Sequence, residues 1–128
     1  MSTSKPRILV VEDEIIVALF MEDILKEFGY EVADVVGHLD DAMACSADFD
    51  IAVLDVHLNG HSVFDFADIL AARGVPFVFA TGYGERSVPD RHRSRPVLQK
   101  PFQPEDLKRV LEQVAQTGSP SGQVIGLA

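Results

Sequence analysis

A chain of 128 residues with a single cysteine, Cys45, is long enough for one compact domain and cannot form an internal disulfide. Its formal net charge of −9 argues against nucleic-acid binding through the whole surface, so we expect no nucleic-acid partner. Because no apolar run is long enough for a membrane span and no signal-peptide pattern opens the chain, we expect a cytoplasmic protein without a membrane anchor.

Short apolar runs alternate with helical patterns along most of the chain. In chain order the pattern predicts a strand at 8–11, a helix at 15–28, a strand at 31–36, a helix at 39–47, a strand at 51–54, a helix at 63–72, strands at 75–80 and 96–99, and a helix that begins at Pro104. Strands that alternate with helices favour a parallel sheet covered on both faces. We therefore expect an α/β fold with a flavodoxin-like, doubly wound, five-stranded parallel sheet in the order 2-1-3-4-5.

The segment 82–95 departs from this alternation. A fourth helix would belong there, but glycines, Pro89 and several polar residues predict that it is short or irregular. Four of the chain's eleven basic residues lie in the same segment: Arg86, Arg91, Arg93 and Arg95. They form either a solvated loop or a docking patch for an acidic partner.

The two ends of the chain differ in composition from its middle. The first residues, 1–6, are mostly polar, and we expect them to be disordered. The last residues, 117–128, are rich in Gly, Ser and Pro and predict a flexible tail. One folded domain is therefore expected over residues 7–116, without an internal repeat or a second domain.

Acidic side chains follow two neighbouring strands of the predicted sheet. Glu12 and Asp13 come directly after the first strand, and Asp55 ends the third. These strands are adjacent in the order 2-1-3-4-5, so we expect the carboxylates to lie close together. Crowded carboxylates repel one another unless a cation joins them, and an all-oxygen acidic site suits Mg²⁺.

Polar residues also end the two remaining central strands. Thr81 ends the fourth strand and Lys100 ends the fifth. With Asp55 as a carboxylate nucleophile that forms an acyl phosphate, Lys100 can pair with one phosphoryl oxygen and Thr81 can donate a hydrogen bond to another. Each residue alone has a plainer interpretation as a helix cap, a turn or a surface charge. Their joint placement at the strand ends favours phosphoryl chemistry.

Four stretches of the chain form a specific set. They read RILVVEDE at 7–14, IAVLDVH at 51–57, FAT at 79–81 and LQKPF at 98–102. As a set they resemble the receiver domains of two-component response regulators, over about residues 6–116.

The resemblance implies that Asp55 is the phosphoacceptor and that Thr81 and Lys100 contact the phosphoryl group. Besides Asp55, it implies these ligands of Mg²⁺: Glu12, Asp13 and the backbone carbonyl of His57. It also implies a histidine kinase or phosphotransfer protein as the phosphoryl donor and a downstream protein as a further partner. We expect the chain to be a monomer or a weak homodimer.

The stretch FATGYG at 79–84 looks like that of the FAT GUY receivers, mostly single-domain regulators linked to phosphorelays and general stress signalling. Two positions depart from ordinary receivers. Val97 stands where ordinary receivers have Tyr or Phe as the aromatic switch residue, and Tyr83 is the nearest candidate to replace that aromatic. Asn59 stands where proline is usual. We hypothesise that the side chains of His57 and Tyr83 flank the acyl phosphate and limit the access of water; the plainer interpretation is that both are loop residues.

We therefore predict a stand-alone response regulator that catalyses only its own phosphorylation and dephosphorylation, and is not an enzyme with a separate substrate. The alternative is a pseudo-receiver, a phosphorylation-independent protein-binding module, which the missing aromatic at Val97 favours. A flavodoxin-like FMN protein is disfavoured because the acidic residues 12–14 would repel its phosphate. A hydrolase with Asp55 as nucleophile ranks last because its usual second acid is replaced by His57.

Overall fold

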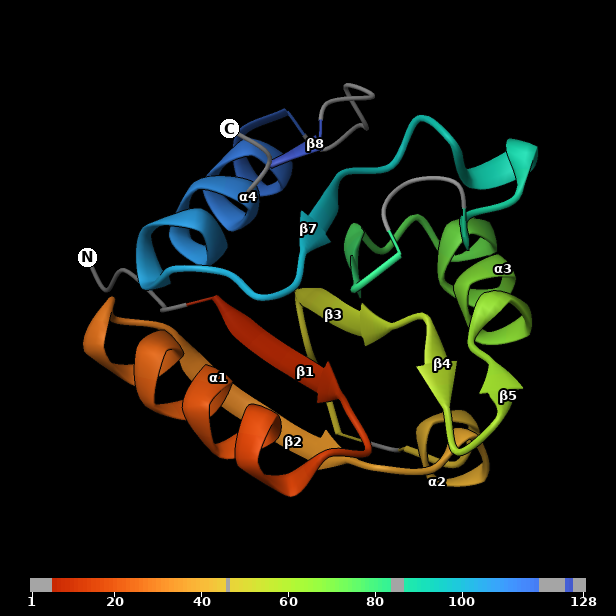
Figure 1. Cartoon of the computed structure of the whole chain (residues 1–128), viewed down its shortest axis with the longest axis horizontal. Coiled ribbons are helices and arrows are strands. Elements are labelled where there is room, and N and C mark those ends of the chain that lie inside the picture. Colours follow the sequence, from red (N-terminus) through yellow and green to blue (C-terminus); the bar gives the residue numbers. More distant parts are fainter. Residues whose placement is uncertain (1–5, 46, 84–86, 118–123, 126–128) are drawn as a thin grey trace.

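The structure is a computed structural model that describes residues 6–45, 47–83, 87–117 and 124–125. Its centre is a six-stranded sheet in which every neighbouring pair is parallel (Figure 1). In spatial order the strands are β2 (Glu31–Val36), β1 (Arg7–Val11), β3 (Ile51–Asp55), β6 (Phe77–Thr81), β7 (Val97–Gln99) and β8 (Val124–Ile125). The strands from β2 to β7 confirm the predicted flavodoxin-like order 2-1-3-4-5.

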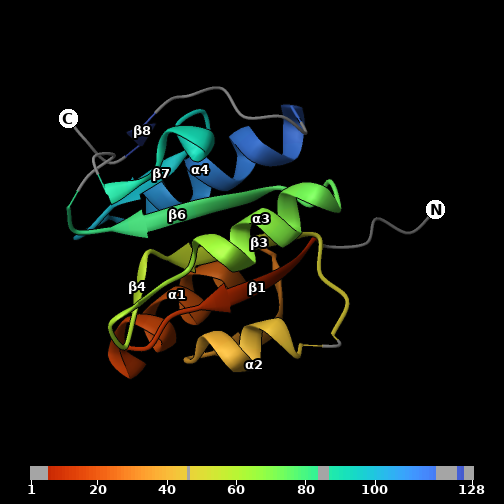
Figure 2. The ribbon, with the colours of Figure 1, turned by 90° about the vertical axis from the view of Figure 1, so that its right-hand side faces the viewer.

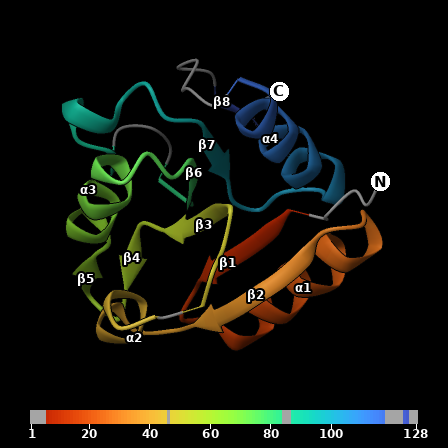
Figure 3. The ribbon, with the colours of Figure 1, turned by 180° about the vertical axis from the view of Figure 1, so that it is seen from behind.

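Helices cover both faces of this sheet, as predicted. They are α1 (Ile15–Glu27), α2 (Leu39–Met43), α3 (Phe64–Ala72) and α4 (Pro104–Thr117). Figure 1 shows α1 and α4 on one side of the strands and α2 and α3 on the other, and in Figure 2 the pair α2 and α3 lies in front of the sheet. Figure 3 shows the same layers from behind, with β2 at the edge of the sheet. No helix in the described part of the chain is long and apolar enough to cross a membrane.

The core is divided in two by the sheet because successive side chains of a strand point to opposite faces. In β1, Ile8 and Val10 join the apolar cluster beneath α1 and α4. Leu9 and Val11 join the other cluster, beneath α2 and α3. All four side chains are buried, which explains why the central strands read as continuous apolar runs rather than as an alternating pattern.

The segment between β6 and β7 has no α-helix among its described residues, as predicted. It contains a 3₁₀ turn at Asp90–His92, and Val88 is buried just before it. His92 is also buried, and its Nε2 lies 2.7 Å from Oδ1 of Asp68 on α3. The aromatic rings of Phe64 and Phe77 lie against the imidazole, so this histidine anchors the segment where a helix would otherwise pack.

Two helices differ from their predictions. The helix expected at 39–47 ends at Met43, because Cys45 and Phe49 pack against the core and the chain leaves the helical path to reach them. In α1, the predicted apolar positions included Ile15 and Leu19, which are 74% and 54% exposed. Ile24 and Leu25, which were also predicted apolar positions, are buried against the sheet as expected, and Ala18 and Met21 complete this face at helical spacing.

Two short pairings were not predicted. After β3 the chain forms an antiparallel hairpin of β4 (His57–Leu58) and β5 (His61–Ser62), joined by Asn59 and Gly60. At the other end, Val124 of β8 pairs with Val97 at the edge of the sheet, within the segment for which a flexible tail is predicted. Of the predicted flexible tail 117–128, Thr117 ends α4, whereas residues 118–123 and 126–128 lie outside the described residues. Of residues 1–6, for which disorder is predicted, Pro6 is described and its carbonyl accepts a hydrogen bond from the N–H of Glu31 at 3.0 Å; residues 1–5 lie outside the described residues.

The packing of α3 gives a test of the core. Leu70 is fully buried and Ile69, its neighbour in the same helix, is 37% exposed. We expect Leu70→Ala to lower the free energy of unfolding by about 2–5 kcal/mol because it leaves a cavity. Ile69→Ala should lower it by roughly 1 kcal/mol, since little apolar surface returns to water. Urea unfolding followed by circular dichroism measures both, and equal losses would contradict this assignment of the core.

Candidate functional site

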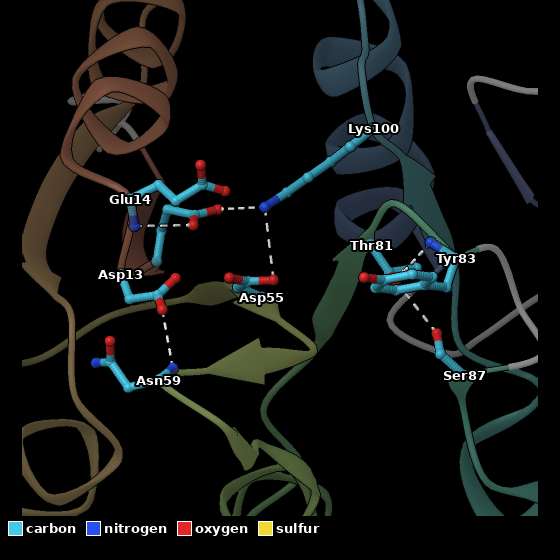
Figure 4. Close-up of polar contacts among 9 residues, drawn as sticks. Asp13, Glu14, Asp55, Asn59, Thr81, Tyr83, Ser87 and Lys100 are labelled. Atoms are coloured by element: carbon cyan, nitrogen blue, oxygen red, sulfur yellow. Dashed lines mark hydrogen bonds and ion pairs between the residues drawn. The ribbon is translucent and has the colours of Figure 1, made fainter.

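Three carboxylates meet at the carboxyl end of the sheet. Glu12 and Asp13 follow β1, and Asp55 is the last residue of β3. β1 and β3 are paired side by side, with Val11 opposite Leu54, and this register brings their ends together. One carboxylate oxygen from each residue lies within 4.8 Å of the others. Figure 4 labels Asp13 and Asp55 of this cluster. The predicted acidic cluster is therefore formed.

Lys100 reaches the cluster from the end of β7. Its Nζ donates a hydrogen bond to Oε1 of Glu12 at 2.7 Å and lies 3.5 Å from Oδ1 of Asp55. Burial opposes the charge of the ammonium group, but the hydrogen bond to Glu12 and the charge of Asp55 outweigh it and raise the pKa of Lys100 above its usual value. Lys100 is therefore charged at neutral pH and faces both carboxylates (Figure 4).

The pKa values of the aspartates move in opposite directions. Burial, followed by the negative charge of Glu12, raises the pKa of Asp55 to about 7, although Lys100 acts against this. For Asp13, burial also acts to raise the pKa, but the backbone N–H of Asn59 donates to Oδ2 at 2.8 Å and the net result is a lowered pKa. A single lysine thus leaves the negative charge at Asp55 only partly compensated.

This donor set fits a hard divalent cation. Carboxylate oxygens are the protein ligands that Mg²⁺ prefers, and three of them face one another here. A divalent charge among them would favour the ionised form of Asp55, whose pKa is raised by burial and by Glu12. The residues that could hold the cation are Glu12, Asp13 and Asp55; the predicted ligation by the backbone carbonyl of His57 stays a prediction.

Thr81 is the last residue of β6, the strand that flanks β3 on the side away from β1. Its Oγ1 accepts a hydrogen bond from the backbone N–H of Tyr83 at 3.0 Å and another from the hydroxyl of Ser87 at 3.2 Å. The side chain of Thr81 is buried at the wall of an open hollow of about 560 Å³, which Asp55 and Lys100 also line. Thr81 is therefore placed beside the cluster, as the sequence predicted.

The two flanking residues line the same hollow. Tyr83 is 74% exposed, and its ring meets that of His57 edge to face, with 5.5 Å between centroids. Val97 is buried in β7 opposite Phe79, so it belongs to the core and cannot swing as an exposed aromatic would. The proposed substitution of Tyr83 for the missing aromatic stays a prediction, but Tyr83 lies at the mouth of the site.

The arginines of the segment before β7 contact the protein itself. Arg91 forms two hydrogen bonds with Asp68, at 2.9 and 3.2 Å. Arg93 donates to the carbonyl of Val88, and the guanidinium of Arg95 lies over the ring of Phe77. These contacts give the described arginines a structural role, so their use as a docking patch stays a prediction; Arg86 and Gly84 lie outside the described residues.

Two residues near the site were not predicted to act there. The backbone N–H of Asn59 donates to Asp13. The Asn-Gly pair at 59–60 could have predicted the hairpin, because this pair favours two-residue turns. Ser87 hydrogen-bonds Thr81 from six residues further along the chain. No sequence pattern predicts the contact of Ser87 with Thr81, since it depends on the path of the loop between them.

The comparisons with known proteins agree with this geometry. A family model of the response regulator receiver domain matches residues 8–112. The chain therefore belongs to the response regulator receiver domain family, which serves as a signalling domain in bacterial two-component systems.

Particular relatives share the fold and part of the sequence. The transcriptional regulatory protein PdtaR of Mycobacterium tuberculosis is 28% identical over 112 residues, which cover 83% of this chain and 55% of PdtaR. The phyllosphere-induced regulator PhyR of Methylorubrum extorquens is 30% identical over 83% of this chain and 42% of PhyR. The chain thus spans about half the length of these curated relatives.

A solved structure covers nearly the same length. The solution structure of SdrG from Sphingomonas melonis Fr1 is 38% identical, with a TM-score of 0.77, over 89% of this chain and 99% of SdrG. These comparisons confirm the receiver resemblance, whereas membership of the FAT GUY subgroup stays a prediction.

The raised pKa of Asp55 predicts a pH-dependent stability. Folding raises this pKa from 3.8 to about 7, so the native state holds the proton more tightly than the unfolded chain between these values. The stability that goes with the neutral carboxyl is lost as the pH rises toward 7. Without divalent cations, Asp55→Asn should therefore raise the Tm by several degrees at pH 8 and by much less at pH 4.5.

Thermal unfolding in EDTA, followed by circular dichroism, measures this difference. Asp23→Asn on the exposed side of α1 is the matched control, and its effect on the Tm should be small at both pH values. A Tm gain for Asp55→Asn that is the same at pH 4.5 and pH 8 would contradict the assigned shift.

Proposed function

We propose that this receiver domain takes a phosphoryl group onto Asp55 from a phosphohistidine of a histidine kinase or phosphotransfer protein, with Mg²⁺ bound at the acidic cluster. One observation carries the proposal: the carboxylate of Asp55 lies between two acidic residues and the ammonium group of Lys100. A phosphoryl group on Asp55 would thus have the ammonium group of Lys100 and the proposed cation site of the acidic cluster as neighbours.

The transfer would form one bond and break one. An oxygen of Asp55 attacks phosphorus, and the O–P bond of an acyl phosphate forms while the N–P bond of the phosphohistidine breaks. The imidazole leaves with the electron pair of that bond and is neutral, because its second nitrogen already carries a proton. Asp55 must be ionised to attack phosphorus. Because its pKa is about 7, a nearby cation would favour the ionised form at neutral pH.

The chain's own residues divide the remaining tasks. Lys100, held by Glu12, would pair with a phosphoryl oxygen as the negative charge moves onto Asp55. Thr81 also lines the hollow and would donate its hydroxyl hydrogen to a second oxygen. Bound Mg²⁺ would supply the positive charge that offsets the phosphoryl oxygens. The reaction has no separate substrate, so the signal would pass through protein partners.

The surface beside the site supports docking of a protein. The first turns of α1 expose an apolar group of side chains: Ile15, Ile16, Leu19 and Phe20. Next to them, a groove of about 330 Å³ is lined by Phe20 and Phe102, whose rings are 5.8 Å apart, and by Lys100 of the site. A donor protein must bring its phosphohistidine to Asp55, and this apolar rim suits such a contact. A downstream target and a monomeric or weakly dimeric state stay part of the proposal.

The first test is phosphorylation by a small-molecule donor. Incubation with acetyl phosphate and Mg²⁺ should add one phosphoryl group to the intact protein, as measured by mass spectrometry. Chelation of the cation should prevent this, and Asp55→Asn should remove it because the amide is a poor nucleophile. Lys100→Met should slow the gain at least tenfold, since one donor to the developing charge is lost.

Asp65→Asn is the matched control, because this exposed aspartate opens α3 outside the cluster. The outcome that contradicts the proposal is a phosphoryl group on Asp55→Asn, or none on the wild-type protein with either acetyl phosphate or a phosphorylated kinase domain. The second outcome would favour the pseudo-receiver, a module that binds proteins without phosphorylation.

The rings of His57 and Tyr83 give a second test of the site. Because both line the hollow and touch each other, we propose that they limit the approach of water to the acyl phosphate. Replacing both with Ala should speed phosphoryl loss several-fold, measured as the decay of the phosphorylated mass after the donor is removed. His61→Ala, on the outer strand of the hairpin, should leave the decay unchanged. Equal decay of the double variant and the wild type would reject this role.

A further inference from the structure

The hairpin after β3 places one residue against the acidic cluster. Its turn residues Asn59 and Gly60 have φ angles of 49° and 83°, both in the left-handed region. The hairpin is tied down because Leu58 is buried and the N–H of Val63 donates to the carbonyl of Val56 at 3.2 Å. The position of the turn is therefore set by the same strand that ends in Asp55.

Asn59 links three separate segments at this point. Its backbone N–H donates to Oδ2 of Asp13 at 2.8 Å, across 46 positions of the chain. Its side-chain Nδ2 donates to the carbonyl of Gly37 at 3.1 Å and lies 3.1 Å from Nδ1 of His38. The ends of β1, β2 and β3 are thus joined through a single residue.

The contact with Asn59 engages one carboxylate oxygen of Asp13, and the other lies on the side of the cluster. Figure 4 shows Oδ2 of Asp13 directed at the N–H of Asn59 while the other oxygen is turned toward Asp55. A carboxylate held in this way loses one rotational freedom before any ligand arrives. Outer hydrogen bonds of this kind orient metal ligands and raise the affinity of the site.

We propose that Asn59 is a positioning residue whose backbone N–H orients Asp13 for the divalent cation and thereby sets the cation affinity of the site. The inference rests on the proposed function, because it assumes that a cation binds at the cluster. In this chain, where residue 59 is Asn and not the proline that is usual in ordinary receivers, the role needs an N–H group and a φ angle in the left-handed region. Proline has neither, since its ring removes the donor and holds φ near −65°.

The Mg²⁺ dissociation constant of the full chain tests the proposal. It is measured by titrating the ¹⁵N-labelled protein with MgCl₂ and following the backbone amide resonances, without any phosphoryl donor. We expect Asn59→Pro to weaken Mg²⁺ binding about tenfold, as loss of an outer hydrogen bond does in other metal sites. Asn59→Gly keeps both the N–H and the left-handed φ, and should bind within about threefold of the wild type. His61→Ala perturbs the other side of the hairpin and should leave the constant unchanged.

A second measurement keeps the test valid if Asn59→Pro does not fold. In the wild-type protein, hydrogen exchange of the Asn59 amide should be slow because the N–H is bonded to Asp13. In Asp13→Ala the same amide should exchange much faster, while the buried Leu54 amide in β3 should stay protected.

Each outcome bears on the inference in a distinct way. If the wild type binds Mg²⁺ and Asn59→Pro binds it equally well, the role of Asn59 is overturned and the proposed function stands. If Asn59→Gly is as weak as Asn59→Pro, the backbone donor is not the cause, and the inference fails. If the wild type binds no Mg²⁺ at all, the cation site itself fails and the inference with it.

Discussion

The ion pair between Lys100 and Glu12, with Asp55 3.5 Å away, is the contact on which the functional geometry depends. Its partners come from the ends of three different strands, 88 positions apart along the chain at the widest. A parallel sheet in the order β2-β1-β3-β6-β7 puts these ends at one edge. The contact therefore depends on the tertiary arrangement of the strands and not on any local part of the sequence.

Burial adds a desolvation cost to this contact and changes the pKa of Asp55. Glu12 and Asp55 are 3% and 7% exposed, so each loses most of its hydration on folding. Burial and then the negative charge of Glu12 raise the pKa of Asp55, and the one ammonium group that faces the three carboxylates offsets this only in part. The fold thus holds a site whose negative charge is not fully compensated by the described residues around it. Such a site is suited to bind positive charge and, through it, a phosphoryl group.

The segment between β6 and β7 replaces a missing helix with a few specific contacts. His92 fills an aromatic space and reaches Asp68, and Arg91 binds the same carboxylate. This end of the segment is therefore held to α3. The other end carries Tyr83, whose backbone N–H and exposed ring connect Thr81 to the surface of the molecule. The described residues of this segment thus contact α3 at one end and the candidate site at the other.

The sequence by itself determined the five central strands, their order and the residues that meet at the acidic edge. Apolar runs and the polar residues that end them are local features, and the order of a parallel sheet follows from general packing rules. Only the tertiary structure decided which face of α1 is buried, because Ile15 and Leu19 are as apolar as the residues that pack. It also decided that the N–H of Asn59 binds Asp13 and that Ser87 binds Thr81. These contacts depend on the paths of loops, and short-range patterns carry little information about which distant groups a loop will bring together.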